Sequence, residues 1–454
     1  MKLYISCLDR TSPETTRYGK ISRMLRVLTF GLITGLVTNA MAFGAAPTNP
    51  GSAKTRPSIS VADSVVREWN HIAYTTIGPA PGPMVGTRFM TITQLAVFEA
   101  VNAITGKYQP YLGTVTAPPG ASAEAAAVVA AHNVLVEYFP AQALSLNMSR
   151  DTSLAAIPDG QSKDDGIAVG AAAASAMIMN RLNDGSSPPM FHMPTNSDPY
   201  EWQTYGGCPA GGGAFRHWQN VTPFAIQSSS QFRSVPPPAL QTGVYAQAFN
   251  ELQTFGDLNS TQRPQDRTDV ARIYAVSVPP TLWNSVLLQI ISGQEGEITD
   301  TARVMALMNM AINDAAVSVF ETKYFYRTWR PITAIPRGDE DGNKWTTAGP
   351  FTPLVGTPCF PSYPSAHGSL SGSALRLLER EYGRFGHSIS IQHASVPGVV
   401  LEYSDLRDIL SDISDARVYG GIHFRFDQTA GEKQGHDVAQ YVYNHTLRKA
   451  AGQH

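Results

Sequence analysis

The first residues with useful chemistry are two cations near a proline. Lys323 and Arg330 are seven residues apart, which is about two helical turns, so one helix would present both on the same face. Pro331 disfavours helix at the preceding residue and so predicts that Arg330 lies near a helix end. Two converging cations repel unless an anion sits between them. Taken alone, this segment is better interpreted as a pair of solvated surface cations.

A second segment combines a hydroxyl with a histidine at an expected helix start. Pro364 favours extended chain, and the run after Ser365 is small and then amphipathic, so Ser365 reads as a helix N-cap. The free N–H groups of Ala366 and His367 would then form a seat for an anion. Small residues in the first turns permit close approach of a neighbouring helix: Gly368, Ser369, Ser371 and Gly372. An ordinary capped helix is the alternative interpretation.

A third segment pairs an imidazole with a carboxylate. His423 and Asp427 are four apart and can meet on one helix face, where the carboxylate would fix which ring nitrogen is free. Arg417 would point about 120° away from His423 in one straight helix. Gly420 and Gly421 indicate that the helix begins or bends there, so both side chains could reach one ion. A structural i,i+4 pair is the alternative.

Together the three segments suit a tetrahedral oxyanion. Lysine and arginine neutralise its oxygens, and backbone N–H groups with a serine hydroxyl bind the remaining lone pairs. One histidine could bond the central atom while the other exchanges protons.

The three segments in this order resemble the signature of the vanadium-dependent haloperoxidases and the type 2 phosphatidic acid phosphatases. That signature reads Lys-x6-Arg-Pro, Pro-Ser-x-His and Arg-x5-His-x3-Asp. It is matched here, within residues 323–427, by Lys323, Arg330, Pro331, Pro364, Ser365, His367, Arg417, His423 and Asp427. The resemblance implies an all-α fold of two packed helical bundles with long Pro/Gly-rich loops, similar to bacterial haloperoxidases.

The resemblance also implies a role for each matched residue. Lys323, Arg330 and Arg417 would hold the oxygens of vanadate or phosphate, with Ser365 and the N–H of Ala366 adding hydrogen bonds. His423 would bond vanadium, or attack phosphorus in a phosphatase. His367 would act as acid and base, and Asp427 would orient His423.

Two positions depart from the family pattern. Ala366 stands where the family has Gly, and Ala416 stands where haloperoxidases prefer Ser. The methyl of Ala366 narrows the approach and disfavours a positive φ, which puts the fine geometry of the anion seat in question.

The favoured function is a vanadate-dependent haloperoxidase acting on hydrogen peroxide, halide and small organic substrates. This branch is favoured by the length of the chain and by two short motifs, Trp329-Arg330-Pro331 and Tyr363-Pro364. Phe360 is a candidate wall of the halide pocket. One alternative is a secreted acid phosphatase with a histidine nucleophile. Another is an inactive oxyanion-binding protein on the same scaffold.

Helical periodicity dominates the elements that must position these residues. Residues 43–265 form an expected N-terminal helical region with a long loop at 184–240, and residues 266–454 form a C-terminal region with a second loop at 336–364. Helices are expected within 92–105, 121–139, 167–182, 300–322, 365–382 and 421–449, and strands are expected to be minor. Asp314 could brace a site cation, although a structural role is as reasonable.

Composition and the N-terminus predict a secreted or periplasmic protein. The 454-residue chain has 43% apolar and 15% charged residues and a net charge of −2, so it offers no electrostatic footprint for nucleic acid. Residues 1–42 show the order of an export signal, with an uncleaved membrane anchor as the alternative. They hold six Lys/Arg and two Asp/Glu, so the rest carries 28 and 34, a net of −6. No later segment is expected to cross a bilayer.

Cysteine usage leaves one question open. Cys208 and Cys359 remain after removal of residues 1–42, and they could pair in an oxidising compartment or stay as two small unpaired residues. The sequence predicts no oligomeric state.

Overall fold

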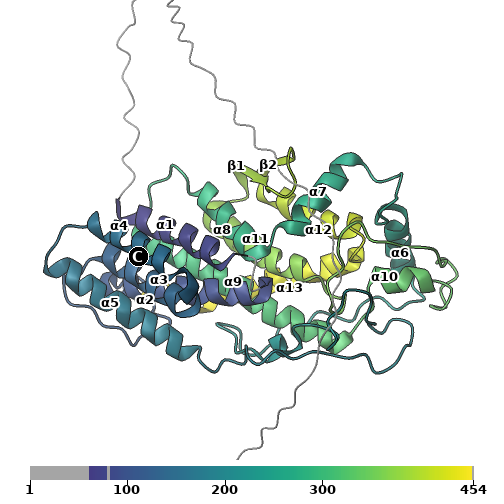
Figure 1. The fold of residues 1–454 in the computed structure, drawn as a ribbon, viewed down its shortest axis with the longest axis horizontal. Helices are drawn as coiled ribbons and strands as arrows, with labels where there is room; N and C mark the ends of the chain where they lie inside the picture. The colour runs from purple at the N-terminus through teal and green to yellow at the C-terminus, as the bar shows by residue number, and fades with distance from the viewer. Residues whose placement is uncertain (1–60, 79–81, 452–454) are drawn as a thin grey trace, which may run out of the picture. The chain divides into compact units, whose positions relative to one another are not determined.

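The computed structural model describes residues 61–78 and 82–451. This part of the chain contains thirteen α-helices, three short 3-10 helices and one two-stranded sheet, so the all-α prediction is confirmed (Figure 1). The predicted export signal at 1–42 lies outside the described residues.

Ala-rich helices build the N-terminal part. They are α1 (Val61–Ile77), α2 (Pro83–Thr105), α3 (Ala123–Tyr138), α4 (Ala143–Ala155) and α5 (Gln161–Asn180). A Cβ at Gly166 or Gly170 of α5 would come within 2.4 Å of a backbone carbonyl oxygen of α3 or its cap. The small residues therefore permit the two helices to touch backbone to backbone.

The C-terminal part carries the helices that position the three segments. They are α6 (Gly243–Phe255), α7 (Gln265–Val276), α8 (Pro279–Ile290), α9 (Ile298–Tyr326), α10 (Pro331–Ala334), α11 (Ala366–Tyr382), α12 (Leu406–Tyr419) and α13 (Arg425–His445). The expected helix at 421–449 is wrong at its start, because Gly421 has a φ of +79° and the helix begins only at Arg425.

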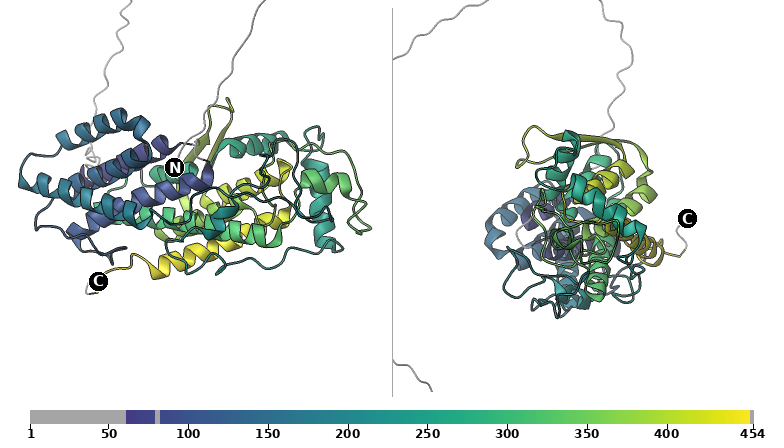
Figure 2. Two further views of the ribbon diagram at one scale, coloured as in Figure 1. Left: turned by 60° about the horizontal axis from the view of Figure 1, so that its bottom comes forward. Right: turned by 90° about the vertical axis from the view of Figure 1, so that its right-hand side faces the viewer.

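Helix α9 is the shared core of the fold. It packs against α2 on one side and against α11 and α13 on another (Figure 2). By length and composition it could cross a membrane, which corrects the expectation that no later segment is apolar enough. The whole of its apolar window is buried inside the protein, as in the core helix of a globular fold.

The hairpin β1 (Phe385–Gln392) and β2 (Val400–Asp405) lies between α11 and α12 in the chain. The strands pair antiparallel, with Ile389 opposite Tyr403 and Ile391 opposite Leu401. Ile389 and Ile391 are buried while the residues between and beside them are exposed, the alternation expected of a strand with one face on the core.

The long loop at 184–240 is held to α9 by a buried carboxylate. Asp314 accepts the backbone N–H groups of Phe224, Ala225 and Ile226 at 2.7, 2.7 and 2.9 Å. Asp314 therefore binds the loop and does not brace a site cation. The ordered loop matches the expectation from its aromatic content.

Helices α11 and α13 approach at a seam of glycines. A Cβ at Gly435 would lie 1.9 Å from the Ser369 carbonyl oxygen, and one at Gly431 would lie 2.4 Å from that of Ser365. The predicted close approach at the small residues of α11 is thus confirmed, and the glycines that face them are on α13. This seam fixes the position of Ser365 relative to the start of α13.

We expect Gly435→Ala to lower the free energy of unfolding by about 1–3 kcal/mol, because the methyl forces the helices apart. Thermal melts followed by circular dichroism measure this. Gly243→Ala is the matched control: no atom lies within 4 Å of its Cβ position, so its melting temperature should stay close to that of the parent. Equal melting temperatures for both variants would show that the seam is not tightly packed.

Candidate active site

Lys323 joins the end of α9 to the loop before α11. Its ammonium is fully buried and donates to the carbonyls of Pro361 at 2.9 Å, Ser362 at 2.8 Å and Pro364. Three backbone acceptors use all of its hydrogens. The lysine thus shapes the loop that carries Ser365 and contributes its charge to the site.

Arg330 reaches the site by a route that differs from the expected shared helix face. Helix α9 ends at Tyr326, and Arg327 adopts left-handed backbone with φ +49°. Arg330 is the extended N-cap of α10, as Pro331 predicted. Its guanidinium donates from Nε to the Phe360 carbonyl at 2.9 Å and from Nη1 to the Ile422 carbonyl at 2.8 Å.

Ser365 caps α11 as predicted. Its hydroxyl accepts the Gly368 N–H at 3.2 Å, and its own N–H donates to the Asp427 carbonyl at 2.9 Å. Ala366 is the first helical residue and is absent from the positive-φ residues in the described ranges. The missing glycine therefore causes no backbone strain, which answers the question raised by this departure.

His423 and Asp427 meet, although not on one helix face. His423 lies in the turn before α13 and Asp427 in the first turn of that helix; Nδ1 and Oδ2 are 2.8 Å apart. The same carboxylate oxygen accepts the Ser362 hydroxyl at 2.6 Å and the Phe424 N–H at 3.1 Å. Sequence reasoning missed Ser362, because nothing separates it in type from other loop serines.

These contacts fix the tautomer of His423. Its Nε2 lies 2.9 Å from Nη1 of Arg330, which can only donate. Nε2 is therefore the acceptor, and Nδ1 carries the hydrogen donated to Asp427. The lone pair of Nε2 points at the Arg330 cation and accepts its hydrogen bond. An oxyanion that binds beside Arg330 could take this lone pair for a bond to its central atom.

Arg417 approaches from the last turn of α12. Its Nη1 donates to the Tyr274 carbonyl at 3.2 Å, and its Nε has no partner among the described residues. The turn at Gly420 and Gly421 brings the chain round to His423, as the glycine pair indicated. Nη2 of Arg330 is likewise buried without a partner in this part of the chain.

The site concentrates positive charge without a paired carboxylate. Lys323 and Arg330 are fully buried and Arg417 is 4% exposed, yet none forms an ion pair with Asp or Glu within the described ranges. Burial and the nearby Arg330 lower the pKa of Arg417 to about 9. Burial, Arg330 and Arg417 also lower the pKa of Lys323. A bound anion would relieve both costs.

His367 lies in the first turn of α11, and its ring lies close to the backbone of Ser277. Burial, and then the charges of Arg417, Lys323 and Arg330, lower its pKa well below 6.5. His367 is thus neutral near neutral pH in the anion-free protein, and a negative charge beside it would favour its protonation.

A pH dependence of stability follows from His367. The unfolded chain binds a proton at His367 more readily than the folded protein does. Neutral His367 therefore contributes to the free energy of unfolding above pH 6.5, and this contribution is lost as the pH falls below 6.5. The free energy of unfolding then changes by up to about 1.4 kcal/mol per pH unit.

We expect the melting temperature of the anion-free protein to fall more steeply on acidification than that of His367→Gln. His436→Gln, which alters an exposed histidine, should follow the parent curve. Parallel curves for the parent and His367→Gln would contradict the assignment.

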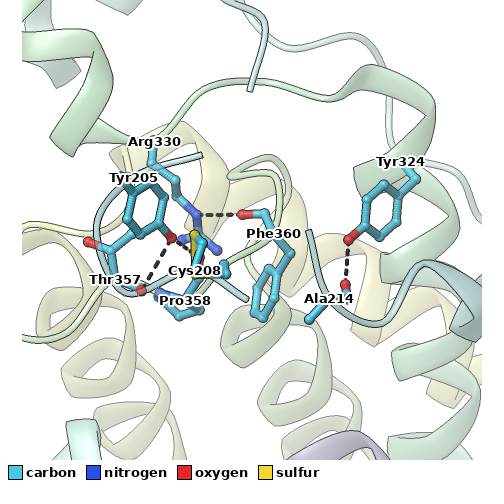
Figure 3. Close-up of a disulfide and its surroundings, with 9 residues drawn as sticks. Tyr205, Cys208, Ala214, Tyr324, Arg330, Thr357, Pro358 and Phe360 are labelled. Carbon is cyan, nitrogen blue, oxygen red and sulfur yellow. Dashed lines mark hydrogen bonds between the residues drawn. A yellow bond between two sulfur atoms is a disulfide. The ribbon is translucent and has the colours of Figure 1, made fainter. Parts of the chain in front are cut away.

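Phe360 forms a wall beside two of the cations. Its ring centroid lies 5.2 Å from Lys323 Nζ and 5.0 Å from Arg330 Cζ. The preceding residue, Cys359, is bonded to Cys208, and Figure 3 shows this disulfide beside Tyr205 and Arg330. The two cysteines therefore pair, and the bond ties the long loop to the segment that carries Phe360.

Further contacts secure the same segment. The Tyr205 hydroxyl donates to the carbonyls of Thr357 and Pro358, and the Ala214 N–H donates to that of Cys359 at 2.7 Å. Since Arg330 bonds the Phe360 carbonyl, the disulfide and its neighbours hold one of the site cations in place indirectly.

Replacing both Cys208 and Cys359 by Ser should lower the free energy of unfolding by about 2–5 kcal/mol. It should also weaken binding of inorganic phosphate, measured by calorimetry, because the support of Arg330 loosens. Reduction of the parent with a phosphine should reproduce both effects, and the double variant should not respond to the reductant. Unaltered phosphate binding would show that the disulfide does not support the site.

The structure thus brings the predicted residues together around one buried spot. Comparisons with known proteins cover the part of the chain that carries these residues. The family model described as VCPO second helical-bundle domain matches residues 303–452. This C-terminal third of the chain is similar to that domain of the vanadium haloperoxidases.

Individual relatives are distant. Vanadium chloroperoxidase of Curvularia inaequalis is 29% identical over 195 residues, which cover 36% of this chain and 32% of the relative. The match thus spans about a third of that enzyme. A bacterial vanadium-dependent iodoperoxidase structure superposes with a TM-score of 0.72 at 22% identity, covering 88% of this chain and all of that one. An apo bacterial vanadium-dependent chloroperoxidase gives 0.65 at 16% identity, covering 80% and 94%. At these identities the structural matches show the haloperoxidase fold alone.

The residues fit vanadate as an oxyanion. The described ranges hold no cluster of three or more His, Cys, Asp or Glu for a bare metal ion. The site itself holds three buried cations, two guanidinium nitrogens without a partner among the described residues, and an imidazole lone pair directed at Arg330. This donor set suits a small tetra-oxo anion with one nitrogen ligand.

Proposed function

We propose that the protein is a vanadate-dependent haloperoxidase that uses hydrogen peroxide to oxidise halide to hypohalous acid. The observation that carries this proposal is the deprotonated Nε2 of His423, directed at Arg330, amid three buried cations that form no ion pair with a carboxylate in the described ranges. The similarity of residues 303–452 to the family model and the haloperoxidase fold support it.

Each residue would contribute a separate part of the binding. Lys323, Arg330 and Arg417 would neutralise the oxygens of vanadate, and Ser365 with the N–H groups at the start of α11 would donate further hydrogen bonds. His423 would supply the nitrogen ligand. Vanadate, when bound, supplies Lewis-acid activation of peroxide.

The remaining side chains would control protons and halide access. Asp427 holds the hydrogen on Nδ1 of His423 and so keeps the opposite nitrogen deprotonated. His367, neutral when the site is empty, can accept a proton from an incoming peroxide and return it to the leaving oxygen. Phe360 would exclude water on the side where halide enters.

A secreted acid phosphatase is the alternative supported by the same geometry. The lone pair of His423 that would bond vanadium could also attack the phosphorus of a phosphomonoester. An inactive oxyanion-binding protein is less well supported, because Ala366 leaves the helix start unstrained.

One paired assay separates these functions. The purified protein is freed of phosphate, and iodide and bromide oxidation by peroxide is measured with and without orthovanadate, alongside hydrolysis of a phosphomonoester. We expect halide oxidation that requires vanadate. Phosphoester turnover inhibited by vanadate would support the phosphatase instead, and absence of both activities would support the binding protein.

We expect His423→Ala to lower vanadate-dependent halide oxidation by at least about 100-fold, since even loss of a ligand's partner costs 10–100-fold. Inorganic phosphate should still bind, because the three cations remain, and this binding shows that the variant is folded. His436→Ala, on an exposed part of α13, should keep full activity. Full halide oxidation by His423→Ala would refute the assignment of the vanadium ligand.

We also propose that the protein works in a secreted or periplasmic setting. The disulfide between Cys208 and Cys359 supports this, because such bonds persist mainly in oxidising compartments.

A further inference from the structure

A cavity of about 660 Å³ lies on the other side of the segment that supports His367 and Arg417. Four parts of the chain line it: the end of α1, the connection between α7 and α8, the length of α8, and the end of β1. Its volume falls in the range of small-molecule sites. Figure 1 shows β1, α7 and α8 on the same side of the protein.

The link between cavity and active site is the chain at the end of α7. Ser277 lines the cavity, and its backbone lies close to the ring of His367. Three residues earlier, the Tyr274 carbonyl accepts from Arg417 at 3.2 Å. One short stretch of backbone therefore faces two of the proposed active-site residues and also forms a cavity wall.

The cavity lining carries no permanently charged side chain. Among the described residues that line it there is no Asp, Glu, Lys or Arg, and the titratable side chains are Tyr74 and His393. The lining is aliphatic at Val276, Val278, Leu282, Val286 and Ile391. A charged ligand would lose its hydration here without gaining an ion pair, so the cavity favours a neutral, largely apolar molecule.

Two of the hydroxyl groups that line the cavity, those of Thr75 and Ser277, can accept a hydrogen bond from a ligand. Thr75 and Ser277 donate their hydrogens to the carbonyls of His71 and Ile273, both at 2.8 Å. The Tyr74 hydroxyl lies 2.6 Å from Nδ1 of His71. Oxygens whose hydrogens are engaged keep lone pairs for a donor on the ligand.

The cavity is also pre-formed. The Ser390 N–H donates to Oε1 of Gln289 at 2.8 Å, and Nε2 of Gln289 donates to the Ser390 carbonyl at 3.2 Å. These two bonds fix the end of β1 against α8. A ligand therefore need not pay to order this wall.

We propose that this cavity binds a neutral phenol-type molecule, an aromatic ring with an O–H donor, as the acceptor of the halogen. The inference rests on the proposed function, which supplies hypohalous acid beside His367. In the reaction, a ring carbon forms a bond to halogen while the oxygen–halogen bond breaks, the ring loses a proton, and water is released. Hypohalous acid and arene thus give haloarene and water.

The first test measures binding without vanadate, peroxide or halide. Titration of the full chain with 2-naphthol near neutral pH, followed by calorimetry, should show saturable binding at one site. Naphthalene-2-sulfonate, similar in shape but charged, should bind at least about tenfold more weakly, because the lining offers no cation. Absence of saturable 2-naphthol binding, or equal binding of the sulfonate, would overturn the proposal.

Variants locate the site. Thr281→Trp and Ser285→Phe fill the cavity from two turns of α8 and should each weaken 2-naphthol binding at least about tenfold. Ala275→Trp adds the same bulk at an exposed residue of α7 outside the lining and should bind as the parent does. Circular dichroism melts confirm folding. If Ala275→Trp loses 2-naphthol binding as strongly as the filled variants, or if both filled variants keep it, the molecule binds elsewhere and the proposed site is wrong.

An activity ratio then connects the cavity to halogen transfer. With vanadate, peroxide and bromide, the rate of 2-naphthol bromination is divided by the rate of triiodide formation in parallel iodide assays. The ratio should fall about tenfold in Thr281→Trp relative to Ala275→Trp, in step with binding. An unchanged ratio would overturn the role as acceptor site. If the parent forms no triiodide, the proposed haloperoxidase function is wrong. The binding of 2-naphthol in the cavity is then judged by the calorimetric titration alone.

Discussion

The repulsion among three buried cations is the constraint on which the rest of this structure depends. Lys323, Arg330 and Arg417 are held within one region from which water is nearly excluded, and the described ranges offer them no ion-pair partner. Such an arrangement is costly unless the protein fixes each group by other means. Backbone carbonyls from three separate segments meet this need: the loop at 360–364, the turn at Ile422 and the end of α7 at Tyr274. The fold is the framework that positions them.

Each supporting element follows from that requirement. The loop before α11 turns its carbonyls toward Lys323, and the disulfide and Tyr205 keep the upstream part of that loop in place. The end of α7 offers a carbonyl to Arg417. The glycine seam between α11 and α13 then sets the spacing of the serine cap and the histidine turn. The packing of small residues between α11 and α13 thus sets the distances between polar groups of the site.

The sequence predicted the site residues better than the way in which they are presented. Types and spacing identified all three segments, the Ser365 cap and the break at Gly420. The expected shared helix face of Lys323 and Arg330 was wrong, since the helix ends between them, and His423 lies before its helix. Both errors arise because side-chain spacing alone does not show where a helix stops.

Other contributions had no sequence signal. The carbonyls of Tyr274, Phe360 and Ile422 hold site cations, and every residue carries a carbonyl, so no residue type marks them. Ser362 acts through a position that only the folded loop defines. The hairpin escaped notice because its alternation is short, and the pairing of Cys208 with Cys359 depended on a separation that only the fold provides.

The central position of α9 bears on how the chain can be divided. The helix is buried by α2 from the N-terminal part and by α11 and α13 from the C-terminal part. A cut near residue 265 would therefore expose the apolar surface of α9 that α2 covers. Neither piece would then be an autonomous folding unit, and the two would be recovered only by complementation. Any fusion or circular permutation must therefore keep α2, α11 and α13 in the same polypeptide as α9, or supply the missing helices as a second chain.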